Sequence, residues 1–426
     1  MTPRSGPPYC GIDFGTSNST IALADAAGAR LIAVEGGAVT LPSAVFWESD
    51  GAAPEFGRAA IAAYVRGDDG RLMRGLKSTL GSSLIHERTR VGNRALSFRD
   101  ILARFFGHLR ARLEREAPGV ERVVLGRPVH FVDDDPAGDA AAQAVLAEIA
   151  RSVGFRDVAF QYEPIAAALH YEQSVTREQL VLIVDVGGGT SDFSIVRVGP
   201  ARIAAADRAQ DILANDGIRV GGTDFDRLLS LASVMPHLGL GSGTGGGKSL
   251  MPRHYYIDLA TWHRINMVYT GRTQTDLKAL RAEADRPDLL DRLIRLVNGR
   301  QGHALAMAVE AAKIALSDGD TVRLALSDVC GGADGGGPDP VLRRAEFEVA
   351  VAGPVQRVEN RLTGILAQAG VGADRIGTVF MTGGSSGLPL LHRVVGRVLP
   401  GVPIATGDML GSVGTGLALD AARRFG

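Results

Sequence analysis

The segment GIDFGTSNST, from Gly11 to Thr20, has an aspartate directly before a glycine turn and hydroxyl side chains after it. A second version, VDVGGGTSDFS, runs from Val184 to Ser194. Strand-like apolar runs flank both turns, so we expect each turn to join two strands of a hairpin. The repetition predicts two similar halves whose hairpin tips close on one phosphate chain from both sides. A strand-to-helix phosphate loop would instead bind at a single helix N-terminus.

Length and composition limit the class of protein. A chain of 426 residues is too long for one hydrophobic core, so two or more domains are expected. The net charge of -1 argues against nucleic acid and membrane surfaces as partners. Cys10 and Cys330 are the only cysteines, which predicts a reducing cytoplasm rather than a disulfide framework. The start of the chain lacks the apolar core of a signal peptide, and no apolar run of about 18 residues could span a bilayer.

Periodicity and glycine content predict the order of the elements. We expect helices over residues 99–115, 139–153, 344–369 and 412–424, a helical excursion over 225–316, and extended segments over 120–131, 321–328 and 378–384. The glycine-rich stretches 239–249 and 331–340 are interpreted as flexible surface insertions. The first contains GTGGGKS, which resembles a phosphate loop. Ser242 stands where that pattern needs its first glycine, so we expect a solvated loop there.

Three aspartates at the two hairpins are candidate metal ligands. Asp13 and Asp185 end buried strand patterns just before the glycine turns, and Asp192 follows the second turn, where we expect it to contact the metal through a bound water. A single aspartate before glycine is most often a turn former. Two such carboxylates beside a polyphosphate would repel it unless a cation lay between them, and Mg²⁺ needs few direct protein ligands. The candidate phosphate ligands are the side chains of Thr16, Ser17, Asn18 and Thr190 and the backbone of Gly187, Gly188 and Gly189.

Two further residues are candidates for the chemical step. Glu163 precedes Pro164 at an expected helix start, where the helix dipole favours a carboxylate. Seen alone it reads equally well as an ordinary acidic helix start. Beside two phosphate hairpins, we expect it to orient the attacking water. Lys77 is one of four lysines in a chain that otherwise uses arginine, so we expect its ammonium to reach a γ-phosphate rather than only solvent.

A polar stripe on an apolar helix is the candidate nucleoside contact. Glu310, Lys313 and Ser317 recur at steps of three and four, so they share one face. An exposed helix face is the alternative; a stripe bordering a cleft would bind the ribose and the base. Gly383 and Gly384 end the last expected strand, where backbone can lie flat against a nucleoside.

The motifs together resemble the ATPase domain of the DnaK-type seventy-kilodalton heat-shock family, within the actin-like ATPase superfamily. The matching segments are GIDFGTSNS, VDVGGGTSDFSI, VGGTDFD, YEPIAAAL, VEAAKIALS and TGGSSGLP, with RGLKSTLG as a looser match. The resemblance runs from Tyr9 to about Gly416. It implies a catalytic set of Lys77, Glu163, Asp185 and Thr190. It also implies nucleotide contacts from Gly15, Gly221, Gly222, Ser385 and, with shifted spacing, Asp408.

The resemblance implies an α/β fold with two duplicated ribonuclease-H-like domains and a nucleotide cleft between them. We expect domain I over residues 1–178 and 405–426, with an inserted subdomain at about 42–118. We expect domain II over 179–404, with an inserted helical subdomain at about 229–318. Two departures stand out. Few residues follow Gly416, so no peptide-binding half is expected, as in the short YegD-like putative chaperones. Gly387 replaces the adenine-stacking arginine of the family.

The function implied is Mg²⁺-dependent binding of ATP and ADP with slow hydrolysis that drives a conformational switch. Client or co-chaperone proteins are the expected partners. One alternative is an actin-like filament-forming ATPase, against which Lys77 and the long insertion count. The other is a small-molecule kinase of the same superfamily, for which the first half offers no convincing sugar pocket.

Overall fold

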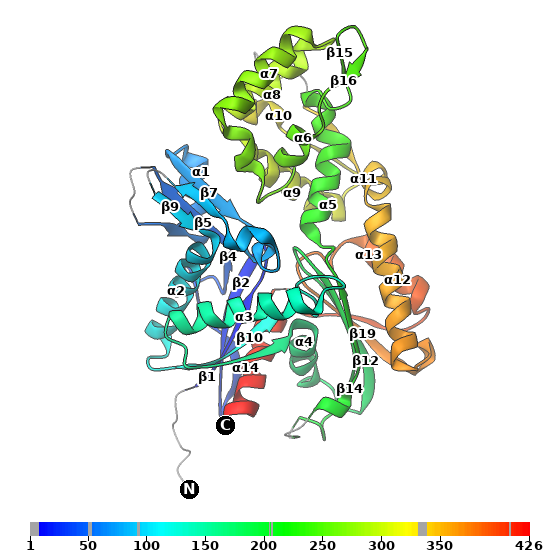
Figure 1. Cartoon of the computed structure of the whole chain (residues 1–426). Coiled ribbons are helices and arrows are strands. Elements are labelled where there is room, and N and C mark those ends of the chain that lie inside the picture. Colours follow the sequence, from blue (N-terminus) through cyan, green and yellow to red (C-terminus); the bar gives the residue numbers. More distant parts are fainter. Residues whose placement is uncertain are drawn as a thin grey trace. The chain divides into compact units, whose positions relative to one another are not determined.

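A computed structural model describes residues 8–49, 53–91, 94–203, 205, 208–330, 339–408 and 410–426. The chain divides into two compact units. The first unit comprises Met1–Gly221, Arg357–Ser386 and Leu391–Gly426. The second comprises Gly222–Gln356 and Gly387–Leu390. The first contains both glycine turns, and the second contains most of the long insertion (Figure 1).

Two sheets of the same topology form the first unit. One has the order β11-β10-β1-β2-β3, and the other has the order β20-β19-β12-β13-β14. Their strands are β1 (Tyr9–Phe14), β2 (Asn18–Asp25), β3 (Gly28–Leu31), β10 (Arg122–Arg127), β11 (Asp157–Tyr162), β12 (Gln179–Val186), β13 (Ser191–Val198), β14 (Ile212–Ile218), β19 (Ile376–Thr382) and β20 (Ile404–Thr406). In each sheet the first three strands are antiparallel, and two parallel strands follow on the other side of the first strand. The predicted duplication is therefore present in the topology.

The register of the two hairpins is also equivalent. In the first hairpin Asp13 pairs with Thr20, and in the second Asp185 pairs with Asp192. Both pairs are seven residues apart and sit at the turn end of their strands. The glycine turns thus join strand to strand, as predicted. Asp13 and Asp185 occupy the same place in the two repeats.

Two helices pack between the sheets of the first unit. They are α4 (Glu163–Glu172) and α14 (Ser412–Phe425). A Cβ on Gly416 would overlap the carbonyl oxygen of Ala166, so the helices are in close backbone contact. The small side chains of Ala166, Ala167 and Ala168 on α4 leave room for this approach. The core they share consists of Val124, Ile165, Ala166, Ala167, Ala168, Val175, Val181, Ile183, Val196, Val198, Phe380, Val413, Leu417 and Ala421.

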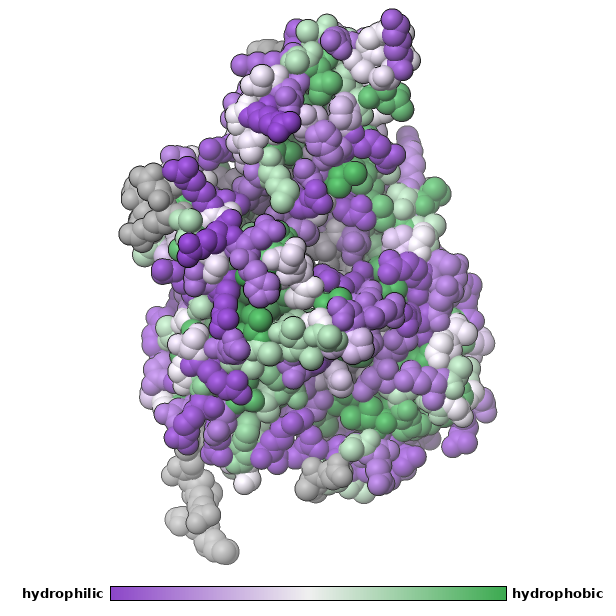
Figure 2. All heavy atoms as spheres, viewed as in Figure 1, coloured by the Kyte–Doolittle hydropathy of each residue, from purple (hydrophilic) through white to green (hydrophobic). Residues whose placement is uncertain are grey.

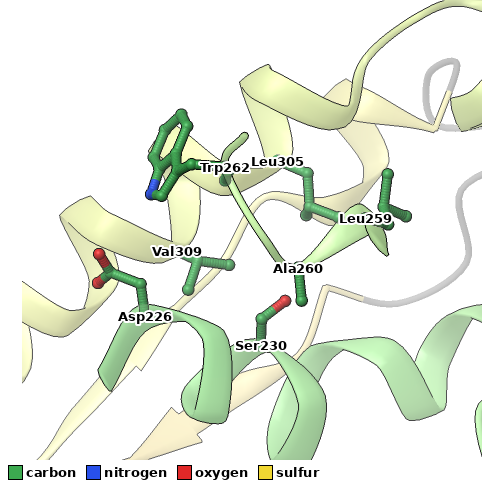
Figure 3. Close-up of a pocket in the computed structure, with 8 residues that line it drawn as sticks. Asp226, Ser230, Leu259, Ala260, Trp262, Leu305 and Val309 are labelled. Carbon is green, nitrogen blue, oxygen red and sulfur yellow. The ribbon is translucent and has the colours of Figure 1, made fainter. Parts of the chain in front are cut away.

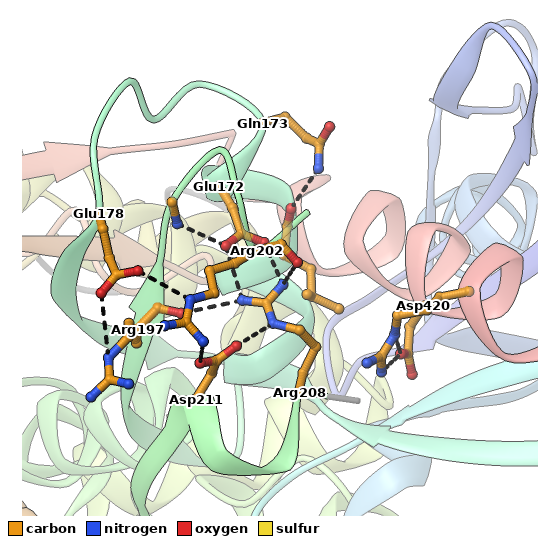
Figure 4. A network of polar contacts seen from close by, with 11 residues as sticks. Glu172, Gln173, Glu178, Arg197, Arg202, Arg208, Asp211 and Asp420 are labelled. Carbon is orange, nitrogen blue, oxygen red and sulfur yellow. Dashed lines mark hydrogen bonds and ion pairs between the residues drawn. The ribbon is translucent and has the colours of Figure 1, made fainter. Parts of the chain in front are cut away.

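The C-terminal end of α4 is fixed by a buried ionic network (Figure 4). Arg208 donates to both carboxylate oxygens of Glu172 at 2.6 and 2.9 Å and to Asp211 at 2.6 Å. All three side chains are at most 6% exposed. Arg202 extends the network by binding both Asp211 and the exposed Glu178. Because buried ions are costly unless paired, this arrangement holds the helix end against the segment before β14.

Further elements complete the N-terminal part of the first unit: β4, which pairs with β2 of the first large sheet, a smaller sheet of order β6-β5-β7, the separate β8–β9 hairpin, and several helices. Their bounds are β4 (Thr40–Pro42), β5 (Ala44–Glu48), β6 (Glu55–Phe56), α1 (Gly57–Arg66), β7 (Gly70–Arg74), η1 (Leu76–Thr79), η2 (Ser83–His86), β8 (Arg88–Val91), β9 (Arg94–Ser97), α2 (Phe98–Glu116) and α3 (Pro136–Ser152). Ser97 and Asp100 form a reciprocal capping box at the start of α2. Asp135 caps α3 through the amide of Gly138. The helices predicted at 99–115 and 139–153 are therefore confirmed.

The second unit is mostly helical. Its elements include α5 (Gly222–Leu229), η4 (Ser230–Val234), η5 (Met235–Leu238), β15 (Gly243–Thr244), β16 (Ser249–Leu250), α6 (His254–Leu259), η6 (Ile265–Tyr269), α7 (Gly271–Glu283), α8 (Pro287–Asn298), α9 (Gly302–Asp318), β17 (Thr321–Arg323), α10 (Leu326–Val329), β18 (Val341–Arg343) and α11 (Arg344–Ala350). GTGGGKS forms the β15–β16 hairpin, with Gly245, Gly246 and Gly247 at positive φ. It is a hairpin and not a strand-to-helix loop.

Three sequence predictions need comment. The strand predicted over 321–328 is wrong beyond Arg323, because residues from Leu326 form the short helix α10. The helix predicted over 344–369 is two helices, α11 and α12 (Ala352–Ala369), separated at Val351. The glycine-rich stretch at 331–340 lies outside the described residues up to 338. The predicted last strand and last helix correspond to β19 and α14, and α13 (Pro389–Val398) lies between them.

Hydrophilic residues cover most of the face shown in Figure 2, and apolar residues appear in small separate groups. Large exposed apolar side chains include Leu250, Ile314 and Val349. Among the described helices, none is both long and apolar enough to cross a membrane.

Candidate functional site

The two glycine turns meet within the first unit. A Cβ built on Gly188 would lie 2.5 Å from Ser17 Oγ, and one on Gly189 would lie 2.8 Å from Thr16 Oγ1. Only glycine lets the second turn approach the first this closely. A Cβ on Gly221 would in turn lie 2.6 Å from the Gly188 carbonyl carbon. The structure therefore brings Thr16 and Ser17 of the first turn close to Gly188 and Gly189 of the second, and their binding of phosphate stays a prediction.

Neighbouring backbone and side chains hold each turn. Ser43, which sequence reasoning missed, donates from Oγ to the Gly15 carbonyl at 2.7 Å, and its amide donates to the Ser17 carbonyl. In the second hairpin, Gly187 N–H donates to the Thr190 carbonyl at 2.9 Å. These bonds fix the turns without using the side-chain hydroxyls of Thr16 or Ser17.

The aspartates of the second hairpin are buried, and Asp13 of the first is half-buried. Asp185 is 6% exposed and Asp192 is 1% exposed. Asp192 accepts a hydrogen bond from Val129 N–H at 2.7 Å. Gly383, at φ 84°, lies beside Asp185, where a Cβ would collide with the carboxylate. The glycine predicted at the end of β19 is thus required by the close approach of Asp185.

Lys77 and Glu163 form a buried ion pair beside these aspartates. Lys77 Nζ lies 2.5 Å from Glu163 Oε1, and each residue is 7% exposed. Lys77 lies on η1, which follows Gly75 at φ 67°. Glu163 is the first residue of α4, with Pro164 as the second, as the sequence predicted. Residues 86 positions apart are thereby brought into one cluster.

The cluster has more carboxylates than cations. Burial is the main cause that raises the pKa of Asp13 and of Asp192 to about 7, and the charge of Glu163 adds to it. Burial and the nearby carboxylates also hold the pKa of Asp185 well above its usual range. Burial opposes the charge of Lys77, but the carboxylates of Glu163 and Asp13 raise its pKa overall. One ammonium thus faces four carboxyl groups.

This charge balance fits a divalent cation held mainly through water. Asp13, Asp185 and Asp192 are the residues that would face it, and added positive charge would relieve their mutual repulsion. Within the described ranges, no three His, Cys, Asp or Glu side chains are grouped as direct metal ligands. Mg²⁺ suits such a site because it keeps several of its waters when bound beside phosphates.

The remaining predicted residues of the first unit surround the end of β19 and the start of α14. Gly384 is exposed, whereas Ser385 is buried and donates its amide to the Val186 carbonyl at 2.9 Å. Asp408 is exposed, and its carboxylate accepts from the Leu410 amide while its carbonyl accepts from Ser412 at the start of α14. Its contacts in the structure are those of a helix-start residue, and its nucleotide contact stays a prediction.

The predicted nucleoside residues belong to the second unit. On α9, Lys313 Nζ lies 2.8 Å from Asp226 Oδ1 and donates to the Gly222 carbonyl at 3.4 Å. Both charged side chains are buried, so this end of Lys313 is held inside the unit. Glu310 and Ser317 are partly exposed on the same helix. The adjacent pocket, lined by Asp226, Ser230, Leu259, Ala260, Trp262, Leu305, Ala306 and Val309, has about 10 Å³ of space, enough for about one water (Figure 3).

Several residues that complete the cluster were not found from sequence. Gly126 lies where a Cβ would be 3.3 Å from Glu163 Cγ and 3.5 Å from Asp13 Oδ1. Arg127, the last residue of β10, follows it, and Val129 lies two residues beyond the strand. The only sequence signal was a strand pattern ending in Gly-Arg-Pro, which does not identify the residues that the arginine contacts.

Comparisons with known proteins agree with the geometry. The family model described as Hsp70 protein matches residues 296–422, and the model described as MreB/Mbl protein matches residues 110–231. The chaperone protein HscA of Serratia proteamaculans (strain 568) is 26% identical over 435 residues, covering 96% of this chain and 57% of the relative. HscA of Shigella flexneri serotype 5b is 26% identical and HscA of Citrobacter koseri is 27% identical, each over 432 residues with the same coverage. The chain thus spans a little over half the length of these relatives.

Proposed function

This chain belongs to the Hsp70 family and has the actin-like ATPase fold, and on that premise we propose that it binds ATP with Mg²⁺ and hydrolyses it slowly. The observation that carries the proposal is the cluster formed by the Lys77–Glu163 ion pair and the aspartates of the two hairpins. Bound ATP and ADP would favour different arrangements of the chain, so hydrolysis would act as a conformational switch. A chaperone-like role, with client or co-chaperone partners, follows from the relatives and is part of the proposal.

Each group of the cluster has a distinct task in this proposal. The backbone amides and hydroxyls of the two turns would bind phosphate oxygens. Mg²⁺ would supply positive charge at the phosphates, facing Asp13, Asp185 and Asp192. Lys77 would stabilise charge on the transferring phosphoryl group. Glu163 would orient the attacking water and accept its proton, because its carboxylate lies beside both Lys77 and the hairpin tips.

The nucleoside contacts rest on the resemblance. We propose that Glu310 and Lys313 bind the ribose and that Ser317 lies near the base. Lys313 already contacts Asp226, so it would bind ribose with its charge partly balanced. This arrangement would favour a neutral hydroxyl as its ligand rather than a phosphate.

Isothermal titration with ADP tests binding, and single-turnover hydrolysis of ATP tests chemistry. We expect ADP binding that requires Mg²⁺ and a slow single-turnover rate in the wild-type chain. Equal ADP affinity in EDTA would overturn the metal assignment. An absence of hydrolysis, with tight binding of ATP, would reduce the proposal to a nucleotide-binding protein.

A second candidate is the actin-like filament-forming ATPase that the sequence left open. The match of the MreB/Mbl model to residues 110–231 favours retaining it. Sedimentation of the chain with ATP, ADP or no nucleotide distinguishes the two. ATP-dependent pelleting supports a filament, and a chain that stays in the supernatant in all three states supports the first candidate.

A further inference from the structure

We propose that Arg127 is a positioning residue that sets the geometry of Asp192 and Glu163. The geometry is argued from contacts within the first unit. Its use in ATP hydrolysis rests on the proposed function. Arg127 is the last residue of β10 and is 7% exposed. A buried arginine at a strand end is costly unless its charge and its N–H groups are all compensated, so its contacts indicate what it holds.

The guanidinium group of Arg127 binds the turn that follows β10. Its Nε donates to the Pro128 carbonyl at 2.9 Å, and Nη2 donates to the Val129 carbonyl at 3.0 Å. The same Nη2 donates to Asp139 Oδ2 and Nη1 donates to Gln143 Oε1, both at 2.5 Å. The fork thus joins the turn to α3 through four hydrogen bonds.

The turn held by Arg127 reaches Asp192 directly. Val129, whose carbonyl accepts from Arg127, donates its own N–H to Asp192 Oδ1 at 2.7 Å. Asp192 pairs with Asp185 in the second hairpin. A Cβ on Gly217, which pairs with Asp192 from β14, would lie 2.6 Å from the same Asp192 Oδ1 and 3.2 Å from Val129 Cβ. The Asp192 carboxylate is therefore confined between the turn and β14, and the position of the turn sets its orientation.

Arg127 also contacts the residue before Glu163. Its guanidinium carbon lies 5.1 Å from the ring centres of both Phe131 and Tyr162. Tyr162 pairs with Arg127 across the β10–β11 ladder and is followed at once by Glu163. One side chain therefore contacts both the turn that reaches Asp192 and the strand end from which Glu163 projects. Lysine could not replace it, because a single ammonium lacks the planar fork that makes these bonds together.

The test compares Arg127→Lys and Arg127→Met with a matched control, Arg122→Met. Arg122 is the first residue of the same strand, lies over the rings of Tyr9 and Phe425, and donates to the Phe425 carbonyl. At about 3.3 Å per residue it lies roughly 16 Å away along the strand. Like Arg127, Arg122 is an arginine that lies over two aromatic rings, but it is at the opposite end of β10 from the Lys77–Glu163 cluster. Arg127→Lys keeps a charge opposite Asp139, so it is the variant expected to fold if Arg127→Met does not.

Two measurements separate a positioning role from a structural one. We expect the single-turnover rate of Arg127→Lys to fall about 10- to 100-fold, the range typical of residues that orient ligands of a metal site. ADP affinity should change less than about threefold, because the two glycine turns are untouched. In an Asp192→Asn background the same substitution should reduce the rate at least about threefold less than in the wild type, because only the contact of Arg127 with the residue before Glu163 then remains. Arg122→Met should leave the rate unchanged.

The second measurement does not depend on activity. NMR-detected hydrogen exchange of the Val129 amide should be at least about tenfold faster in Arg127→Lys than in the wild type and in Arg122→Met. Unchanged exchange, or an equal loss of rate with and without Asp192→Asn, would overturn the proposal. A wild-type chain without hydrolysis would refute the proposed function instead, and the exchange result alone would then decide the role of Arg127.

Discussion

Removing either partner of the Lys77–Glu163 pair should have unequal effects on stability and similar effects on chemistry. The two side chains are 2.5 Å apart and each is 7% exposed. Lys77→Ala leaves Glu163 buried beside three aspartates without its cation. Glu163→Gln leaves Lys77 with a neutral acceptor and with the carboxylate of Asp13, which also raises its pKa. The first change worsens the charge imbalance of the cluster, and the second relieves it.

The magnitudes follow from this imbalance. Breaking a buried ion pair by deleting one partner costs about 3–5 kcal/mol. Uptake of a proton by Asp13 or Asp192, whose pKa values are already raised to about 7, would limit the loss to the lower end of that range. For Glu163→Gln we expect a loss of about 1 kcal/mol or less, because a hydrogen bond is kept and repulsion is reduced. The double variant should recover about 1–3 kcal/mol relative to Lys77→Ala alone.

Differential scanning fluorimetry without nucleotide measures the change in Tm, and urea denaturation of the same variants measures the change in the free energy of unfolding. At about 2–4 °C per kcal/mol, Lys77→Ala should lower the Tm of the first unit by roughly 5–10 °C, and Glu163→Gln should change it by less than about 3 °C. In contrast to their unequal effects on Tm, the two substitutions should affect ATP hydrolysis similarly. Both single variants should lose single-turnover activity by about 100-fold or more while retaining ADP binding within a few-fold.

Three results would refute this reasoning. Equal Tm losses in the two single variants would mean that the pair contributes only local packing. A wild-type single-turnover rate in either variant would remove that residue from the chemical step. Additive effects in the double variant would show that the two side chains do not interact in solution.

Three further predictions concern the metal, the base and pH. Asp13→Ala and Asp185→Ala should each weaken Mg²⁺-dependent ADP binding in calorimetry, and unchanged affinity would remove that residue from the metal site. Gly387→Arg should increase the affinity for ADP about tenfold, equivalent to about 1.4 kcal/mol, without changing the affinity for pyrophosphate. The reason is that exposed Ile314 and Gly387 offer no cation to stack on the base. Equal ADP affinity in the variant and the wild type would show that another side chain covers the base. Burial, followed by the charge of nearby arginine, lowers the pKa of His108 to about 4, so the unfolded chain binds the extra proton between pH 4 and 6.5 and stability should rise with pH across that window. Urea titrations should show about 1–3 kcal/mol of this dependence in the wild type and less in His108→Gln, and an identical slope in both would contradict it.

The sequence alone determined the local elements around the site. Period-two apolar patterns on both sides of each glycine turn specify hairpins, whatever the rest of the chain does. The proline after Glu163 specifies a helix start, and the alanines that follow allow α14 to approach closely. These signals are contained in a few neighbouring residues, so they can be interpreted without knowing the packing. The boundary at Val351 was missed because both flanking segments have helical patterns.

Only the tertiary structure decided which distant groups meet. Lys77 in a polar segment reads as a surface lysine, and its contact with Glu163 exists because the fold brings η1 to the start of α4, 86 residues further along the chain. Lys313 was expected to face a ligand, but its ammonium also meets Asp226 from α5. The fork of Arg127 holds a turn whose amide binds Asp192, 63 residues further along the chain. A hydrogen bond between such groups depends on strand order, register and burial, and none of these is fixed by the residues immediately beside either partner.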